Sequence, residues 1–193
     1  MSKRKRAPAS GPGAVPPVIG ERTSGAATHL LLGHGASGTA ASMRPWVESL
    51  GALGVVARAL DLPRSSSERA IGVFRDALVT EPGAALGGHS FGGRMASMLA
   101  AEQSIRALVL LSYPLHRPGH PEELRTGHLP RITCPMLFLS GDRDQFAKVD
   151  LLRSEVAKLP NAQLMIYPGL GHGLLAVRED AAARIADFLS ALT

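Results

Sequence analysis

Short apolar runs alternate with longer amphipathic stretches along most of the chain. The runs are rich in Leu, Val, Ile and Ala and carry little charge, which is typical of strands buried on both faces of a parallel sheet. Turn-forming Gly, Pro, Asp and Ser residues often flank them. The pattern predicts strands over 28–33, 54–60, 84–89, 105–112, 136–140 and 163–167.

Between these runs, apolar residues recur at helical spacing. Residues 66–80 are an example, because Ala70, Val73, Phe74 and Ala77 fall on one face of a helix. The spacing predicts helices over 40–52, 66–80, 91–103, 148–158 and 176–191. Strands that alternate with helices favour a single α/β domain with a mostly parallel sheet of about six strands and helices on both faces. Ligands of such sheets bind at the carboxyl ends of the strands.

The first residues differ in composition from the rest. Residues 1–25 are rich in Pro, Gly and basic residues, so we expect a flexible arm there and the α/β domain over 26–193. The formal net charge is +5, but the KRKR run at 3–6 supplies four positive charges, and the other 17 basic residues nearly balance 16 acidic ones. This balance argues against a nucleic-acid-binding groove. The KRKR run leaves a localisation tag or an RNA-contacting arm open.

Membrane and disulfide signals are missing from the pattern. No apolar run approaches the ~18 residues of a membrane span, and the early Pro and Gly residues do not resemble the apolar core of a signal peptide, so we expect a cytoplasmic protein. Cys134 is the single cysteine, which excludes an internal disulfide and a cysteine-based zinc site. Its place just before a strand predicts a packed residue. The histidines offer no three convergent ligands, so no metal site is predicted.

The stretch Gly88-His89-Ser90-Phe91-Gly92 is a G-x-S-x-G pentapeptide between a predicted strand and a predicted helix. In that setting the motif forms a sharp turn that raises the serine above the sheet. The two glycines let strand and helix pack closely. The N–H of Phe91, at the start of the helix, is available to stabilise an oxyanion. The context predicts Ser90 as a nucleophile.

An elbow serine needs a histidine base and an acid that orients it, in the chain order Ser, Asp or Glu, His. Asp142 and Asp144 follow the predicted strand 136–140, and His172 follows the strand 163–167. The acid must reach sideways to the next loop, so we expect Asp144 to be the acid and Asp142 to stabilise the turn. His89, beside Ser90, is expected to point away from the pocket.

A second glycine-rich stretch, Gly33 to Gly38, follows the first strand. It is a literal G-x-G-x-x-G, and Asp61 ends the next strand, which resembles a dinucleotide-binding fingerprint. Alternatively, the stretch is a His-Gly loop whose Ala36 or Ser37 N–H completes an oxyanion hole. The hydrolase interpretation is favoured because it also uses Ser90, Asp144 and His172. Residues expected to face a substrate are His34, Ser37 and His116.

The segments HGASG, GGHSFGG, SGDRD and GLGHG together resemble the α/β-hydrolase superfamily over nearly everything from residue 28 onward. The chain is similar to its short, lidless members related to dienelactone hydrolase, although those use cysteine where this chain has Ser90. The resemblance implies Ser90 as nucleophile, Asp144 as acid and His172 as base, with Phe91 and Ala36 as oxyanion donors. Residues 112–125 resemble a subgroup whose relatives include subunits of chromatin-modifying complexes.

These observations predict a serine hydrolase that cleaves small acyl esters or thioesters through an acyl-enzyme. The chemistry needs no cofactor and no metal. The segment 113–135 is the only one long enough to cover a pocket, and it is too short for a lid domain. A non-catalytic, hydrolase-shaped interaction module remains an alternative because fold does not fix function.

Overall fold

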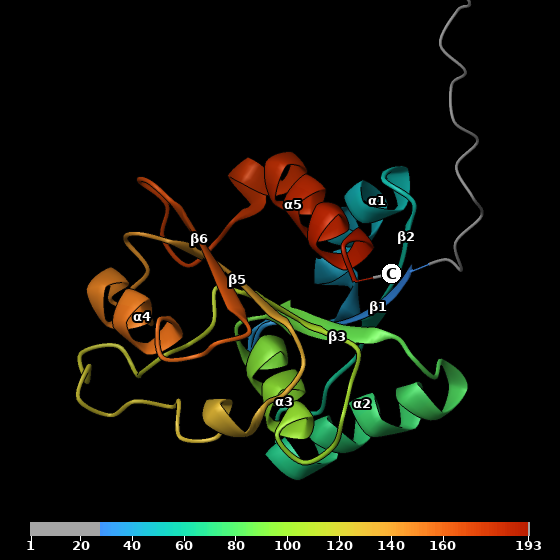
Figure 1. Cartoon of the computed structure of the whole chain (residues 1–193), viewed down its shortest axis with the longest axis horizontal. Coiled ribbons are helices and arrows are strands. Elements are labelled where there is room, and N and C mark those ends of the chain that lie inside the picture. Colours follow the sequence, from blue (N-terminus) through green and yellow to red (C-terminus); the bar gives the residue numbers. More distant parts are fainter. Residues whose placement is uncertain (1–27, 193) are drawn as a thin grey trace, which may run out of the picture.

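The computed structural model describes residues 28–192, so the arm predicted over 1–25 lies outside the described residues. The described chain forms one sheet covered by helices on both faces (Figure 1). Its strands are β1 (Thr28–Gly33), β2 (Val55–Leu60), β3 (Ala85–His89), β4 (Leu108–Leu111), β5 (Met136–Gly141) and β6 (Ala162–Tyr167). All neighbouring strands pair in parallel, in the order β2-β1-β3-β4-β5-β6. The predicted parallel sheet of about six strands is confirmed.

The helices divide into two layers. The α-helices are α1 (Arg44–Ala52), α2 (Ser67–Thr80), α3 (Phe91–Ala100), α4 (Val149–Val156) and α5 (Arg178–Ser190), and short 3₁₀ turns are η1 (Ala40–Met43), η2 (Leu129–Arg131) and η3 (Leu175–Val177). Helices α1 and α5 cover one face of the sheet, and α2 and α3 cover the other (Figure 1). Among residues 28–192, no helix combines the length and apolar character that crossing a lipid bilayer requires.

Two predicted elements differ from the observed ones. The helix predicted over 40–52 begins as the 3₁₀ turn η1 and becomes α-helical at Arg44. Pro45 accounts for this start, because proline fits the first turn of a helix, where no N–H is needed. The strand predicted over 105–112 pairs only over Leu108–Leu111. The chain reaches Ser112 in a left-handed conformation, with φ 48°, and this ends the strand.

The core explains why the strands read as continuous apolar runs. Alternate side chains of the central strands enter two different layers. Leu31 and Leu110 pack on the side of α2 and α3, whereas Leu30 and Leu111 pack on the side of α1 and α5. All four side chains are fully buried. Both faces of each central strand therefore need apolar residues.

The sheet order fixes where loops converge. Strand β2 lies outside β1, and β3 lies on the other side of β1, so the chain changes direction between β1 and β3. Loops that follow two such strands separate to opposite faces and leave a crevice at the carboxyl end of the sheet. The glycine-rich loop after β1 and the turn at Ser90 after β3 both lie at this point. The long segment after β4 carries only η2 among its regular elements, and no lid domain is present within the described residues.

Candidate active site

Ser90 lies at a strained turn between β3 and α3. Its φ is 51°, a left-handed value that is uncommon for a residue with a side chain. The glycines around it are required sterically. Gly88 has φ 152°, and a Cβ there would overlap the backbone of Gly33 on β1. A Cβ at Gly92 would overlap the same residue. The motif therefore lets the start of α3 pack directly against β1, which leaves Ser90 at the tip of the turn.

Asp144 and His172 meet at the carboxyl ends of β5 and β6. The His172 Nδ1 lies 2.9 Å from Oδ1 and 2.8 Å from Oδ2 of Asp144. The Asp144 side chain is completely buried, and the His172 ring is 21% exposed. Because a carboxylate accepts hydrogen bonds, Nδ1 donates and Nε2 is left as the acceptor nitrogen. The N–H of Phe146 also donates to Asp144 Oδ1, at 2.8 Å, so the carboxylate is held from two directions.

The loop of His172 lies against the turn of Ser90. The ring centroid of His172 is 5.0 Å from that of His89, and 4.4 Å from that of Phe146 on its other side. His89 immediately precedes Ser90, so the imidazole of His172 lies beside the turn. Within residues 28–192 the Ser90 hydroxyl makes no hydrogen bond. Such contacts are often long before substrate binds and tighten in the complex.

Two backbone N–H groups next to this turn have no acceptor among the described residues. Those of Phe91, at the start of α3, and Ala36, in the loop after β1, donate no hydrogen bond within the described part of the chain. The loop is tied to the helix because the Gly92 N–H donates to the carbonyl of His34, at 3.0 Å. Arg64 holds it from outside by donating to the Ala36 carbonyl, at 3.1 Å. Paired free N–H groups beside a nucleophile are the elements of an oxyanion hole.

The expected orientation of His89 is wrong. The residue does not point away but lines a cavity that opens between the loop after β1 and the loop that follows His172. Its Nε2 donates to the carbonyl of His172, at 2.9 Å. A Cβ at Gly35 would lie 2.8 Å from its Nδ1. Burial lowers the pKa of His89, which keeps the ring neutral. His89 thus joins the loops after β1 and β6, a role that its sequence position alone does not reveal.

His34 and His116 were also expected to face a substrate, and the structure contradicts both expectations. Both side chains are buried. The Nε2 of His34 accepts from the Leu62 N–H at 2.9 Å, and the Nε2 of His116 accepts from the Lys148 N–H at 3.0 Å. Each ring therefore substitutes for a backbone acceptor between two loops. A buried polar group needs such partners, and these two histidines have them inside the fold.

The two aspartates after β5 have different hydrogen-bond partners. Asp144 holds His172, whereas Asp142 Oδ1 accepts the N–H of Gly169 at 2.7 Å and so joins the turns after β5 and β6. This agrees with the turn-stabilising place expected for Asp142. Asp61, considered for a dinucleotide ribose, accepts the N–H of Ala40 at 2.6 Å.

The dinucleotide interpretation also meets two structural obstacles. Helix α1 begins at Arg44, well after Gly38, so the glycine-rich loop does not open directly into a helix that would bind phosphates. The strand order also differs from the 3-2-1-4-5-6 order of dinucleotide-binding sheets. The loop instead packs against the turn of Ser90, as the hydrolase interpretation requires.

A cavity of about 320 Å³ opens beside this arrangement, on the side of α1 and η3. It is bounded by the loop after β1, by His89 and by the loop after His172. Ser37, expected to face a substrate, is exposed and contributes to its wall. The apolar part of the wall comes from four residues, namely Met43, Trp46, Leu174 and Leu175. The volume suits a small, partly apolar ligand.

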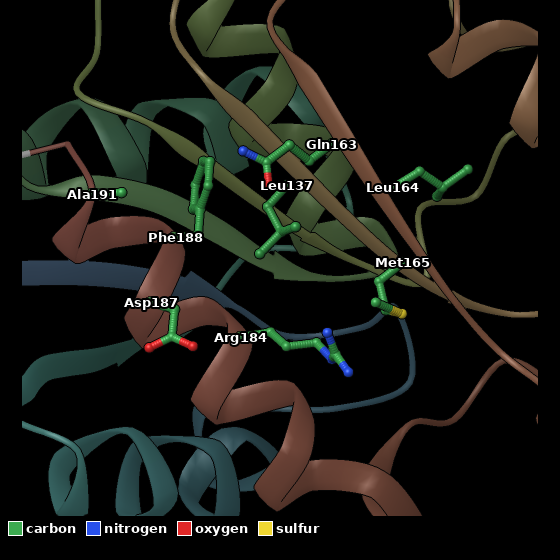
Figure 2. Close-up of a pocket in the computed structure, with 8 residues that line it drawn as sticks. All are labelled: Leu137, Gln163, Leu164, Met165, Arg184, Asp187, Phe188 and Ala191. Carbon is green, nitrogen blue, oxygen red and sulfur yellow. The ribbon is translucent and has the colours of Figure 1, made fainter.

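A second hollow of about 330 Å³ lies near the opposite end of the strands (Figure 2). Leu137 and Gln163, near the starts of β5 and β6, form one wall, and α5 forms the other. Arg184 in this hollow already pairs with Asp180, at 2.7 Å. None of the candidate catalytic residues lines it.

Two other sets of side chains bear on metal and thiol chemistry. Cys134 is buried, and burial raises the pKa of its thiol to about 11, which agrees with the packed residue expected from the sequence. His120, Glu122 and Glu123 could together reach a cation, but all three are exposed. Arg117 already pairs with Glu123.

No pattern in the sequence predicted the conformation or the burial of Ser112. Ser112 ends β4 with φ 48°, is fully buried, and has a hydroxyl without a hydrogen-bond partner among the described residues. The Ser90 N–H donates to the carbonyl of Leu111 at 2.8 Å. The residue just before Ser112 therefore contacts the turn of Ser90. A sequence does not reveal that a serine will adopt a positive φ unless a recognisable motif surrounds it.

Residues 64–189 match the model of a family described as an alpha/beta hydrolase domain. Solved structures with a similar fold include a predicted CIB-like hydrolase from Thermoplasma acidophilum, with 19% identity, a TM-score of 0.71, and 86% of this chain and 88% of that chain covered. A monoacylglycerol lipase from Paleococcus ferrophilus has 17% identity, 86% and 95% coverage, and a TM-score of 0.70. An esterase domain from a Rhodothermus marinus protein has 16% identity, 86% and 85% coverage, and a TM-score of 0.65.

Proposed function

This chain belongs to the alpha/beta hydrolase family, and from that premise we propose that it is a serine hydrolase that cleaves small acyl esters or thioesters through an acyl-enzyme on Ser90. The observation that carries the proposal is the His172 ring held by the buried Asp144 carboxylate beside the turn of Ser90. A buried carboxylate on Nδ1 leaves Nε2 free to accept a proton.

In the first half of the reaction, His172 Nε2 takes the proton of the Ser90 hydroxyl while Oγ attacks the acyl carbonyl carbon. The N–H groups of Phe91 and Ala36 stabilise the oxyanion of the tetrahedral intermediate. Asp144 stabilises the imidazolium that forms. The intermediate collapses when the bond to the alcohol or thiol breaks, and His172 gives its proton to that leaving group. An acyl-enzyme on Ser90 remains.

In the second half, a water molecule attacks the acyl carbonyl. His172 takes a proton from the water as the new C–O bond forms, and then returns a proton to Ser90 Oγ as the ester bond to the enzyme breaks. The acid product leaves and the free enzyme is restored. The cavity beside Ser37 and Trp46 favours a short acyl or alcohol group, because its volume of about 320 Å³ is at the lower end for ligand pockets.

The chemistry can be tested with p-nitrophenyl esters of increasing acyl length. We expect the wild type to hydrolyse short esters best, and Ser90→Ala to lower kcat by at least about 10⁵-fold, as loss of a nucleophile does in a serine protease. Ser112→Ala is the matched control, because Ser112 also has a positive φ at a strand end and its hydroxyl makes no hydrogen bond within the described residues. It should retain activity.

The same experiment distinguishes the alternative of an interaction module. Circular dichroism and thermal melting of Ser90→Ala should match those of the wild type, because alanine only removes the hydroxyl. A well-folded wild type that hydrolyses none of the esters, or a Ser90→Ala variant with undiminished turnover, would contradict the proposed function.

A further inference from the structure

Arginine residues gather where the segment after β4 packs on α3. The cluster consists of Arg94 on α3 together with Arg117, Arg125 and Arg131. Arg117 pairs with Glu123, at 2.6 Å. Within residues 28–192, the guanidinium groups of the other three make no hydrogen bond and no ion pair. Three cations without carboxylate partners in one place leave a strong positive potential.

Arg94 is the innermost member of this cluster. Its Nε is buried and has no hydrogen-bond partner within the described chain. Burying part of a charged group without a partner costs free energy, and a ligand that supplies the partner recovers that cost. Neighbouring groups increase the imbalance. Burial lowers the pKa of Arg125, and the charges of Arg94 and Arg117 lower it further, whereas Glu123 opposes this effect.

Two titratable side chains beside these arginines, His128 and Tyr113, supply no negative charge. Burial, together with Arg94 and Arg131, lowers the pKa of His128 to about 4, so this ring is neutral at pH 7. Burial raises the pKa of Tyr113 to about 12, so its phenol is neutral as well. The cluster thus keeps its positive charge at neutral pH.

Hydrogen bonds fix the backbone and the histidine beside these arginines. The Ser97 hydroxyl lies 2.8 Å from Nε2 of His128, which fastens the segment to α3. The Tyr113 hydroxyl donates to the carbonyl of Arg125 at 2.8 Å, and the N–H of Arg125 donates to the carbonyl of Leu115 at 2.8 Å. Fixed backbone at Arg125 lowers the entropy lost on binding a ligand. The backbone that carries Arg125 is therefore fixed before a ligand binds.

The cluster is adjacent to the proposed nucleophile. The Arg94 N–H donates to the carbonyl of Ser90 at 3.0 Å, in the first turn of α3. Helical side chains lean toward the N-terminus and cover the preceding turn. Four residues of helix span about 6 Å. Arg94 thus lies one helical turn after Ser90 on α3, and it does not line the cavity of Ser37 and Trp46.

We propose that Arg94 and Arg125, with Arg131 at the rim, bind a phosphate group carried by the substrate. This inference rests on the proposed function, and it extends that function to esters with a phosphate a few bonds from the scissile carbonyl. Three unpaired cations match the two charges of a phosphate monoester better than the single charge of a carboxylate, and guanidinium groups bind phosphate oxygens in pairs. A three-carbon spacer, as in an acylated glycerol phosphate, spans the distance of one helical turn.

Binding can be tested apart from catalysis by calorimetric titration with inorganic phosphate and, separately, with succinate. We expect the wild type to bind phosphate, and Arg94→Gln and Arg125→Gln each to weaken binding at least tenfold. Arg75→Gln is the matched control, because Arg75 is an exposed arginine of α2 already paired with Glu102 at 2.9 Å. It should bind as the wild type does. No phosphate binding, equal binding in Arg94→Gln, or equally tight binding of succinate would overturn the assignment.

Catalysis supplies the second test, with 1-butyrylglycerol 3-phosphate and 1-butyrylglycerol as a matched pair. We expect the wild-type kcat/KM to be at least tenfold higher for the phosphate ester, and this ratio to fall toward one in Arg94→Gln but not in Arg75→Gln. Equal turnover of both esters would refute the phosphate site and leave the proposed function standing. Phosphate binding through Arg94 without turnover of either ester would refute the proposed function and leave an anion site without a substrate ester.

Discussion

The carboxyl ends of β3 and β4 lie side by side and both reach a serine in a left-handed conformation. Ser90 follows β3 with φ 51°, and Ser112 follows β4 with φ 48°. The Ser90 N–H donates to the carbonyl of Leu111, the residue before Ser112. Backbone strain of this kind is common at functional sites. Here the same strain occurs twice, one strand apart, and it accompanies very different surroundings.

The surroundings separate the two serines. Ser90 lies between Gly88 and Gly92, α3 begins directly after it, and the ring of His172 packs against His89, the residue before it. Ser112 is followed by Tyr113 and is fully buried, with no partner for its hydroxyl among the described residues. The comparison teaches that a strained turn alone does not make a candidate nucleophile. Close glycine packing, a helix N-terminus and a facing histidine do.

The largest loss of activity is expected when the acid that holds His172, Asp144, is changed. Asp144→Asn keeps the shape of the side chain but removes the charge that orients His172 and stabilises its cation. Such a change costs about 10⁴-fold in kcat in a serine protease. We predict a similar loss on a p-nitrophenyl ester. Asp142→Asn should cost less than about tenfold, because an amide oxygen can still accept the Gly169 N–H. The reverse ranking would assign the acid to Asp142.

The next largest effect is a loss of stability, and it is expected when a glycine of the Ser90 turn is replaced. The Ser112 turn has no such glycines. A Cβ at Gly92 would overlap the backbone of Gly33, which cannot move aside as a side chain could. We predict that Gly92→Ala lowers the free energy of unfolding by about 3 kcal/mol or more, measured by urea denaturation. Gly72→Ala in α2 is the control, because nothing lies within 4 Å of its added Cβ. It should raise stability by up to about 1 kcal/mol. Equal changes in the free energy of unfolding for the two variants would contradict the steric requirement for glycine at this turn.

The smallest effect is expected at the second serine. Ser112→Ala removes a buried hydroxyl without a partner in the described chain, while it keeps the backbone and Cβ. An unpaired buried hydroxyl costs about 1–3 kcal/mol, so we predict unchanged or slightly higher stability in urea, with activity retained. A marked loss of activity with normal folding would show that Ser112 belongs to the reaction, and the contrast between the two strand ends would fail.

The sequence predicted the sheet well because buried parallel strands need apolar residues on both faces, and this requirement leaves continuous runs. Ser90, Asp144 and His172 could be selected because motif, strand ends and chain order all converge on them. The orientation of His89 was missed because residue spacing in a turn does not specify which loop a ring contacts. His34 and His116 were misjudged because a buried histidine that replaces a backbone acceptor resembles an exposed one in sequence.

Contacts between segments that are distant in the sequence could not be predicted, because local residue patterns do not specify how loops pack. Arg94 reads as an ordinary helical arginine, and its unpaired position emerges only when the segment with Arg125 packs on α3. The strain at Ser112 likewise depends on how β4 ends beside β3 and β5. Local pattern determines elements and their order, whereas the packing of loops determines which polar groups remain without partners.

The most direct test of the account is to find which residue a fluorophosphonate modifies. The reagent forms a covalent bond with an activated serine, and mass spectrometry of peptides from the intact, folded protein locates it. We predict a single adduct on Ser90, none on Ser112, and a labelling rate that falls by several orders of magnitude in His172→Ala. Absence of any adduct under conditions that label a known serine esterase, or an adduct on Ser112 instead, would contradict the claim that the turn after β3 carries the nucleophile.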